Sequence, residues 1–387
     1  MKRSKPTVYF DNAATTFPKP REVIDRTLYA MQYACGNPGR SSHRIAMKAA
    51  ETVYGCRSKI SALFNGTEEG VIFTSSATHA LNLAIKTVLH RGDHVLISDI
   101  EHNSVIRPIS ALAERGMITY DVYTAHPQPD RAIASISSLI RSNTAAVIAC
   151  HHSNICNLVQ PIKSIGELCR SRGILLIVDA AQSAGIEDID LRRDCIDVLC
   201  APGHKGLYGI PGSGFALFGE DFCRGKLKLS TFTEGGNGIR SRDTAMPDFL
   251  PERLEAGTLA VPAISALSAG ADFLRRHGLG TIRQREKELF SVLRRELNVF
   301  GDKVTVYGDG TPGGILLFSS RRHPSEELAA ALDRYGICVR AGLHCAPTAH
   351  KKLGTPEDGA VRVSFGAFNR KKEIFHLLNV LDSLLKN

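Results

Sequence analysis

The chain has 387 residues, 43% of them hydrophobic, and a formal net charge of +9. This length exceeds that of a usual single domain, so we expect one large and one smaller domain. The 48 Lys and Arg residues are scattered without a basic run, which argues against nucleic-acid binding and favours anionic ligands. The apolar runs are too short to span a membrane and no secretion signal is recognisable, so we expect a cytoplasmic protein.

Ten cysteines occur without a C-x-x-C pair, which is typical of a chain whose thiols are reduced. The stretch CHHSNIC, residues 150–156, is a candidate for a metal site. It directly follows the strand-like run TAAVIA and lacks a second ligand pair at zinc spacing. We therefore interpret Cys150 and Cys156 as core cysteines at a strand end, and we predict no metal site.

Between about residues 70 and 220, short apolar runs alternate with amphipathic helical segments. The apolar runs are residues 70–76, 94–99, 145–150, 174–181, 196–202 and 213–219, and helical segments include 79–90 and 162–173. Strands that are apolar on both faces and separated by helices indicate a mostly parallel sheet covered by helices. The sequence therefore predicts an α/β doubly wound layer, with ligands beyond the carboxyl ends of the strands.

The pattern changes from about residue 265. Long helices are predicted over 264–278, 282–297 and 325–336, and short strands over 313–320 and 360–365. This mixture is typical of a second, α+β domain. We place the large domain at residues 21–264, and the small domain at residues 1–20 and 265–387.

Polar residues with chemical potential follow four of the predicted strands. Thr78, preceded by two serines, lies where a strand passes into a helix whose N-terminal N–H groups can bind phosphate. His102 follows another strand, where its flat ring could stack on an aromatic ligand. Asp179 ends a buried apolar run and needs a cationic partner. Lys205 follows a further strand, in a Gly-rich loop that permits close approach to a ligand.

An amine and a carboxylate at strand ends are what a pyridoxal phosphate enzyme requires. Lys205 supplies the amine for a Schiff base, and Asp179 supplies the carboxylate that keeps the pyridine nitrogen protonated. The segment RAGLHCAPTAHKK, residues 340–352, adds a cysteine in a loop with basic residues on both sides. A cysteine near positive charge can ionise and act as a nucleophile, whereas most buried cysteines are inert.

Together these motifs resemble the class V aminotransferase family of fold-type I pyridoxal phosphate enzymes, and within it the cysteine desulfurases and selenocysteine lyases. The resemblance covers nearly the whole chain, through YFDNAATTFPKP, GNPGRSSHR, TSSATHALN, EHNS, HHSNICN, VDAAQSAG, GHKGLYGIPG, EAGTLAVP, RAGLHCAP and VRVSFGAFN. It implies a large domain with a mostly parallel seven-stranded sheet sandwiched by helices, and a smaller α+β domain that carries the Cys345 loop.

The resemblance also implies how a pyridoxal 5'-phosphate cofactor would be held. Lys205 would form the Schiff base and Asp179 would pair with the pyridine nitrogen. Gln182 would contact the phenolic oxygen, and His102 would stack on the ring. The phosphate would be held by Ala77, Thr78 and His204, and by Thr258 from the second subunit of a homodimer.

For the substrate, the resemblance implies that Asn154 and Arg362 bind an amino acid, with Arg362 gripping its carboxylate. Cys345 would take the sulfur as a persulfide, leaving alanine, and would pass it to an acceptor protein. The short loop around Cys345 is similar to that of Suf-type enzymes rather than to the long mobile loop of the Isc/Nif type. We therefore predict a cysteine desulfurase whose catalytic residues are Lys205, Cys345 and His102.

Several positions depart from the family pattern, among them Ser76 in place of a glycine and the run APT, residues 346–348, in place of AQP. His79 stands where relatives have glutamate, and we interpret it as a packing residue; Leu343 stands where many Suf-type relatives have a second histidine. Selenocysteine lyase is the alternative function, because no residue separates L-cysteine from L-selenocysteine. Another class V lyase or an aminotransferase would not need Cys345. A scaffold with a relay thiol would need neither Lys205 nor Asp179.

Overall fold

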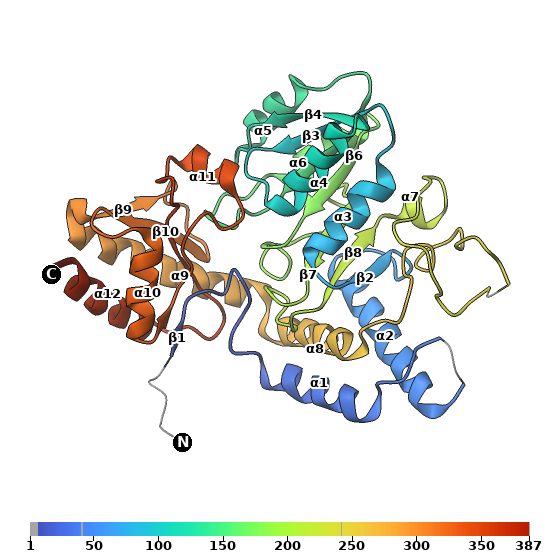
Figure 1. The fold of residues 1–387 in the computed structure, drawn as a ribbon, viewed down its shortest axis with the longest axis horizontal. Helices are drawn as coiled ribbons and strands as arrows, with labels where there is room; N and C mark the ends of the chain where they lie inside the picture. The colour runs from blue at the N-terminus through green and yellow to red at the C-terminus, as the bar shows by residue number, and fades with distance from the viewer. Residues whose placement is uncertain (1–6, 40–41, 241, 387) are drawn as a thin grey trace.

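The structure is a computed structural model that describes residues 7–39, 42–240 and 242–386. Arg40 and Ser41 of the GNPGRSSHR motif lie outside the described residues. A seven-stranded sheet and a three-stranded sheet form in different parts of the molecule (Figure 1). Across the described residues, no helix combines the length and the hydropathy that a membrane span would need.

The seven-stranded sheet contains the predicted apolar runs. Its strands are β2 (Val71–Thr74), β3 (Asp93–Ser98), β4 (Ile118–Tyr123), β5 (Thr144–Cys150), β6 (Leu175–Asp179), β7 (Val198–Pro202) and β8 (Gly214–Phe218). They lie in the order β2-β8-β7-β6-β5-β3-β4. Strands β3 to β7 pair in parallel, whereas β8 is antiparallel to both of its neighbours. The predicted mostly parallel seven-stranded sheet is confirmed.

Helices cover both faces of this sheet. Side chains that follow one another in a strand point to opposite faces, so the neighbours of successive residues show which helices cover each face. In β6, Leu176 and Val178 join one core cluster with residues of α2 (Arg44–Leu63), α6 (Ile162–Ser171) and α8 (Val261–His277). Ile177 between them joins a second cluster with α3 (Ala77–Val88) and α4 (Asn103–Glu114). Further helices are α1 (Arg21–Tyr33), α5 (Pro129–Ser137) and α7 (Glu220–Cys223).

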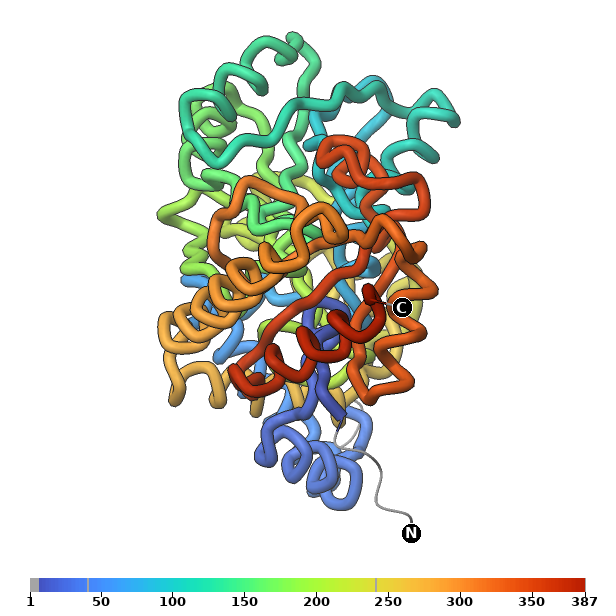
Figure 2. Tube along the Cα trace, turned by 90° about the vertical axis from the view of Figure 1, so that its left-hand side faces the viewer, coloured from blue at the N-terminus to red at the C-terminus, as the bar shows by residue number. Residues whose placement is uncertain are grey.

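The C-terminal part of the chain builds the smaller sheet. Strand β10 (Ile315–Ser320) lies between β12 (Val361–Ser364) and β9 (Val304–Tyr307), and both pairings are antiparallel. The surrounding helices are α9 (Leu279–Leu297), α10 (Ser325–Arg334), α11 (Pro347–Leu353) and α12 (Lys371–Lys386), with a 3-10 turn at Asn298–Lys303. Figure 2 views the molecule from this side, with the C-terminal elements in orange and red.

The N-terminal segment crosses between the two sheets. Strand β1 (Val8–Tyr9) pairs in parallel with β11 (Ile337–Cys338), and Asp11 forms a bridge with Ser364 of β12. At the predicted boundary between residues 264 and 265, α8 continues without a break and packs against α1 and α2. A Cβ atom on Gly270 of α8 would lie 2.0 Å from the Leu207 carbonyl oxygen, so only glycine lets this helix lie so close to the Lys205 loop. The division of the chain at residues 20 and 264 stays a prediction.

Candidate active site

A cavity at the carboxyl ends of the parallel strands brings together most of the predicted site residues. Its lining comes from the ends of β3, β5, β6 and β7 and from the start of α3. The lining residues are Ala77, Thr78, His102, Ser104, Cys150, His152, Asn154, Asp179, Ala181, Gln182, Pro202, His204 and Lys205. The parallel topology causes this gathering, because it places the ends of these strands at one edge of the sheet.

The amine of Lys205 lies in surroundings that disfavour its protonated, positively charged form. Burial, followed by the nearby positive charge of Arg362, lowers the pKa of Lys205 to about 8, and the carboxylate of Asp179 opposes this shift. Above pH 8 the amine is therefore mostly neutral, and a neutral amine is the nucleophilic form.

Asp179 is a carboxylate without direct access to water. Its side chain is 2% exposed, and Oδ1 accepts a hydrogen bond of 2.8 Å from the N–H of Ala181. Burial raises the pKa of Asp179, whereas the Ala181 hydrogen bond and Lys205 lower it. A buried carboxylate of this kind is stabilised by a cationic partner in the cavity.

Two side chains at helix N-termini are held by Ser104. The Nδ1 atom of His102, the N-cap of α4, accepts the Ser104 N–H at 3.0 Å. The hydroxyl of Thr78, in the first turn of α3, lies 3.0 Å from the Ser104 hydroxyl. Burial, together with Lys205, lowers the pKa of His102 to about 4, so its ring is neutral near pH 7. The cavity thus contains a flat neutral imidazole and the positive end of the α3 dipole.

The N-terminal segment holds the main chain immediately before Lys205. The carbonyl oxygen of His204 accepts hydrogen bonds from the hydroxyls of Thr15 and Thr16, and from Nζ of Lys19 at 2.8 Å. The His204 side chain lines the cavity, and its buried Nδ1 has no hydrogen-bond partner among the described residues. Burial lowers the pKa of His204 to about 4, so this ring too is neutral near pH 7.

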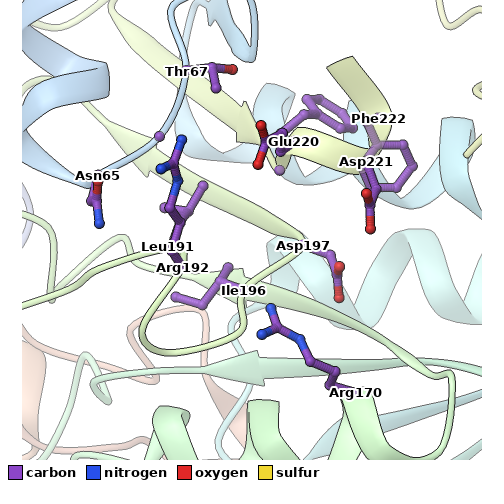
Figure 3. A pocket seen from close by; sticks show the side chains of 13 residues that line it. Asn65, Thr67, Arg170, Leu191, Arg192, Ile196, Asp197, Glu220, Asp221 and Phe222 are labelled. Carbon is purple, nitrogen blue, oxygen red and sulfur yellow. The ribbon is translucent and has the colours of Figure 1, made fainter. Parts of the chain in front are cut away.

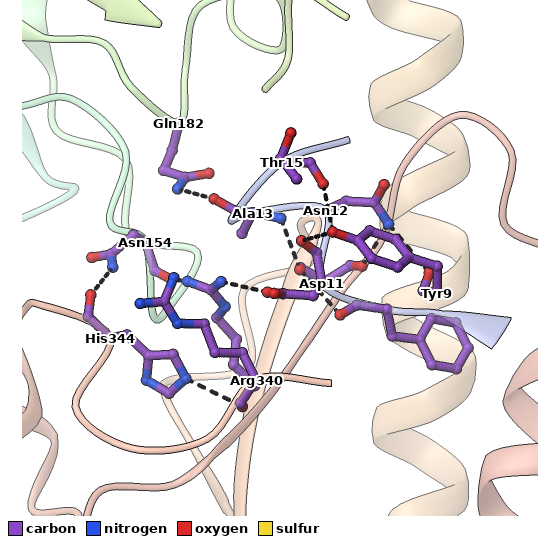
Figure 4. A network of polar contacts seen from close by, with 12 residues as sticks. Tyr9, Asp11, Asn12, Ala13, Thr15, Asn154, Gln182, Arg340 and His344 are labelled. Atoms are coloured by element: carbon purple, nitrogen blue, oxygen red, sulfur yellow. Dashed lines mark hydrogen bonds and ion pairs between the residues drawn. The ribbon is translucent and has the colours of Figure 1, made fainter. Parts of the chain in front are cut away.

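Arg362 joins a polar network beside the cavity through Asp11 and Asn154, and Figure 4 shows these two partners close to Gln182 and Arg340. The Arg362 side chain is 1% exposed; Nη2 lies 2.8 Å from Oδ1 of Asp11, and Nη1 donates to the carbonyl of Asn154 at 3.0 Å. The Nε atom of Arg362 and Oδ1 of Asn154 are buried without a partner in the described structure. Gln182 belongs to the same network, where its Nε2 donates to the carbonyl of Ala13 at 2.9 Å.

Cys345 lies in the loop immediately before α11, and its side chain is exposed. Its carbonyl oxygen accepts a 2.8 Å hydrogen bond from the N–H of Asn103, the residue after His102. The amide of Asn154 donates at 2.8 Å to the carbonyl of His344, the residue before Cys345. Cys345 does not line the cavity itself, but these two contacts fasten its main chain to residues beside it.

Thr258, His79 and Leu343 lie outside the cavity lining, as Cys345 and Arg362 also do. Thr258 is exposed in the segment before α8. His79 has its Nδ1 3.3 Å from the hydroxyl of Ser75, and its ring centre is 5.7 Å from that of Phe232, which agrees with the interpretation of His79 as a packing residue. Leu343 is 41% exposed, two residues before Cys345.

Glu101 and Arg340 are residues of the site region to which the sequence assigned no role. Glu101 is fully buried, and its Oε1 accepts the N–H of Cys150 at 2.6 Å; burial raises its pKa to about 8. The positive charge of Arg340 contributes to the lowered pKa values of Lys205 and His102. Both residues lie in motifs that carry the family resemblance, EHNS and RAGLHC. Their place in these motifs is the sequence signal that could have pointed to them.

The CHHSNIC stretch lies partly in the core. Cys150 ends β5, is 4% exposed and packs in a cluster with Ile100 and Ile155, which confirms its interpretation as a core cysteine at a strand end. Cys156 lies half-buried in the following loop. In the part of the chain that the structure describes, no group of three or more His, Cys, Asp or Glu side chains could hold a metal ion.

A second cavity, of about 310 Å³, lies at the opposite edge of the large sheet (Figure 3). Asp197, in its wall, immediately precedes β7, whereas Lys205 follows that strand. Oδ2 of Asp197 accepts the Leu176 N–H at 2.7 Å, and the nearby Arg170 opposes the rise of the Asp197 pKa to about 6 that burial causes. None of the residues predicted for the site lines this cavity.

The lowered pKa of Lys205 predicts when its amine reacts with an aldehyde. In full-length protein prepared without pyridoxal phosphate, reductive methylation of Lys205 should be half-maximal near pH 8, because only the neutral amine reacts. Asp179→Asn should move that midpoint to lower pH by about one unit, since an opposite charge is removed. Mass spectrometry of the Lys205 peptide measures both midpoints. A Lys205 midpoint equal to that of the exposed lysines in the same digest would contradict the lowered pKa.

Comparisons with known proteins agree on one family. The profile of the family described as Aminotransferase class-V matches residues 8–377. A probable cysteine desulfurase of Methanothermobacter thermautotrophicus is 32% identical over 384 residues, which cover 97% of this chain and 94% of the relative. The apo structure of a cysteine desulfurase from Thermococcus onnurineus NA1 has a TM-score of 0.88 at 27% identity, covering 98% of this chain and 95% of that one. A cysteine desulfurase structure from Escherichia coli shares the fold, with a TM-score of 0.85 at 23% identity over 98% of this chain and 95% of that one. The chain therefore belongs to the class-V aminotransferase family.

Proposed function

We propose that the chain is a pyridoxal phosphate-dependent cysteine desulfurase, which converts L-cysteine to L-alanine and holds the sulfur as a persulfide on Cys345. The observation that carries this proposal is the attachment of the Cys345 loop to the Lys205 cavity, through the 2.8 Å hydrogen bond from Asn103 to the Cys345 carbonyl. An aminotransferase would have no use for a thiol at this place. Similarity to proteins named cysteine desulfurases supports the same function.

The residues of the cavity fit pyridoxal 5'-phosphate. The buried carboxylate of Asp179 would pair with the protonated pyridine nitrogen of the cofactor. The amine of Lys205, whose pKa is lowered, would bond to the aldehyde carbon of the cofactor. The unpartnered Nδ1 of His204 and the N-terminus of α3 at Ala77 offer donors to the phosphate. His102 offers a flat neutral ring for stacking, and Gln182 lies within reach of the same cavity.

When bound, pyridoxal phosphate supplies an electron sink for negative charge that develops on substrate carbon atoms. The protein residues bind and orient the substrate. Arg362 grips the substrate carboxylate, for which its Nε, without a partner among the described residues, provides a donor. Asn154, whose Oδ1 likewise has no partner in the described part of the chain, contacts the amino acid beside it. Lys205 removes the proton from the substrate α-carbon at Nζ, because its lowered pKa leaves it a base near pH 8.

The sulfur step is a transfer between two thiols. The thiolate of Cys345 forms a bond to the γ-sulfur of the substrate, and the bond between that sulfur and the β-carbon breaks. The electron pair of the broken bond stays with the carbon fragment, which takes up one proton at the β-carbon, regains the α-proton from Nζ of Lys205 and leaves as alanine. Cys345 then holds a persulfide on a short loop, so a separate acceptor protein is needed to collect the sulfur. We also propose a cytoplasmic location, which the ten free cysteines support.

Two variants test the proposed function by separating the cofactor from the thiol. Lys205→Ala should abolish the borohydride-reducible linkage to pyridoxal phosphate, because among the described residues that line the cavity Lys205 is the one lysine. Cys345→Ser should keep that linkage and still bind L-cysteine, but should form alanine more than about 100-fold more slowly, because a hydroxyl is a far poorer nucleophile at neutral pH. Spectroscopy and alanine analysis measure these outcomes. Normal desulfuration by Cys345→Ser would overturn the persulfide mechanism.

Selenocysteine, the alternative substrate that the sequence leaves open, belongs in the same assay. Release of selenium from L-selenocysteine by Cys345→Ser, with no alanine from L-cysteine, would favour a selenocysteine lyase. Pyruvate and free sulfide from the unaltered protein, without a persulfide on Cys345, would favour another class V lyase.

The proposed enzyme is a homodimer, and the outer face of α1 supports this. Val23 and Ala30 of α1 are buried on the side that packs against α8. Around the rest of its circumference α1 exposes large apolar side chains at Ile24, Leu28, Tyr29, Met31 and Tyr33. Such a patch is unusual on a monomer and fits a second copy of the chain. Thr258 is exposed and does not line the cavity of its own chain, which fits a contact with the phosphate of the other subunit.

Light scattering tests the homodimer. The unaltered protein should show twice the 42.0 kDa mass of one chain. Met31→Glu, which places a charge on the α1 patch, should shift the mass toward that of the monomer, whereas Val299→Glu, at a residue that is 81% exposed in the 3-10 turn, should not. An active monomer of the unaltered protein would contradict the assignment of Thr258 to the other subunit.

A further inference from the structure

The main chain at Cys345 has a conformation that side chains other than glycine rarely adopt. His344 and Cys345 have φ angles of 51° and 56°, so two successive residues with a Cβ lie in the left-handed region. Such a conformation persists only where the surrounding contacts hold it. The residues that make those contacts therefore determine where the Cys345 thiol lies.

Two of these contacts come from residues that follow strands of the large sheet, one at the start of α4 and one in the loop after β5. Nδ2 of Asn154 donates to the His344 carbonyl, and the N–H of Asn103 donates to the Cys345 carbonyl, both at 2.8 Å. The helix α11 that follows is fastened nearby, since Nζ of Lys352 lies 2.9 Å from Oδ1 of Asp99. These bonds hold the two carbonyl groups, but they do not hold the His344 side chain.

The His344 side chain is held by a buried chain of hydrogen bonds that runs through α11. His344 is 4% exposed and His350 is 2% exposed. The Nδ1 atom of His344 lies 3.1 Å from Nε2 of His350, and Nδ1 of His350 lies 2.9 Å from the Thr355 hydroxyl. At the other end, Nε2 of His344 lies 3.3 Å from the carbonyl oxygen of Arg340.

Only one arrangement of hydrogens satisfies this chain. A carbonyl oxygen can only accept, so Nε2 of His344 carries a hydrogen and donates to Arg340. Nδ1 of the neutral His344 ring then accepts, so Nε2 of His350 donates to it. Nδ1 of His350 in turn accepts from the Thr355 hydroxyl. Burial lowers the pKa of His350 to about 4 and that of His344 to about 2, so both rings stay neutral above about pH 5.

We propose that His350 is a positioning residue for Cys345. Through its donated hydrogen bond it fixes the ring of His344, and thereby holds the left-handed main chain that directs the Cys345 thiol toward the substrate. This inference rests on the proposed desulfurase function, because its consequence is the rate of sulfur transfer. Without the donor, His344 and Cys345 relax toward negative φ and the thiol moves away from the substrate sulfur.

Substitutions at His350 test whether the donor or only the bulk of the ring matters. Glutamine can place an amide N–H near the position of Nε2, whereas asparagine is too short to reach His344 and leucine has no donor. His350→Leu and His350→Asn should therefore slow persulfide formation by about 10- to 100-fold, and His350→Gln should restore most of the rate. The binding of L-cysteine should stay within about twofold in all three variants, because the hydrogen bonds of the Arg362 side chain to Asp11 and to the Asn154 carbonyl do not involve His344. Lys351→Ala, on the exposed side of the same helix, is the control and should leave both quantities unchanged.

Hydrogen exchange gives a second measurement that does not depend on turnover. The N–H of Asn103 is protected by its bond to the Cys345 carbonyl, so the peptide that carries it should exchange faster in His350→Leu and His350→Asn, and at the original rate in His350→Gln. Equal rates of persulfide formation in all variants, or equal losses in His350→Gln and His350→Leu, would overturn the positioning role. If the unaltered protein makes no persulfide, the proposed function fails, whereas loss of Asn103 protection in His350→Leu still reports the hydrogen-bond chain.

Discussion

The burial of one guanidinium, that of Arg362, is the interaction on which the site depends. A guanidinium that is 1% exposed must be compensated by hydrogen bonds. Its partners are Asp11 of the N-terminal segment and the carbonyl of Asn154 in the loop after β5, while its own main chain bridges to Arg340. Segments that are far apart in the sequence must therefore meet before Arg362 can leave water, and they meet beside the cavity that Lys205 lines.

The positive charge of the Arg362 guanidinium also influences the protonation of neighbouring groups. Arg362 contributes to the lowered pKa values of Lys205, His102 and His344, after the larger effect of burial. Each of these groups is consequently more neutral at a working pH than it would be in water. A site of this kind combines a nucleophilic amine with a positive field that attracts a carboxylate.

The sequence predicts most of the large sheet, because β2, β3 and β5 to β8 are buried and therefore read as apolar runs. It misses β4, an edge strand in which only Ile118 and Tyr123 are fully buried. Lys205 and Asp179 can be found because each directly follows or ends a buried strand. The pairing of Asp11 with Arg362 could not be predicted, since 351 residues separate them and only the fold joins them. The role proposed for His350 could not be predicted from the sequence either, because it depends on a hydrogen bond to the ring of His344, which is itself buried.

The transfer of sulfur from the substrate to Cys345 is the central claim, and tracing the sulfur atom tests it most directly. In a single turnover with L-cysteine that carries a heavy sulfur isotope, the quenched protein is alkylated and digested, and its cysteine peptides are weighed by mass spectrometry. We predict that the heavy sulfur appears as a persulfide on Cys345, in an amount equal to the alanine formed. Alanine without heavy sulfur on Cys345, or with the label on Cys338 or Cys156 instead, would contradict this account.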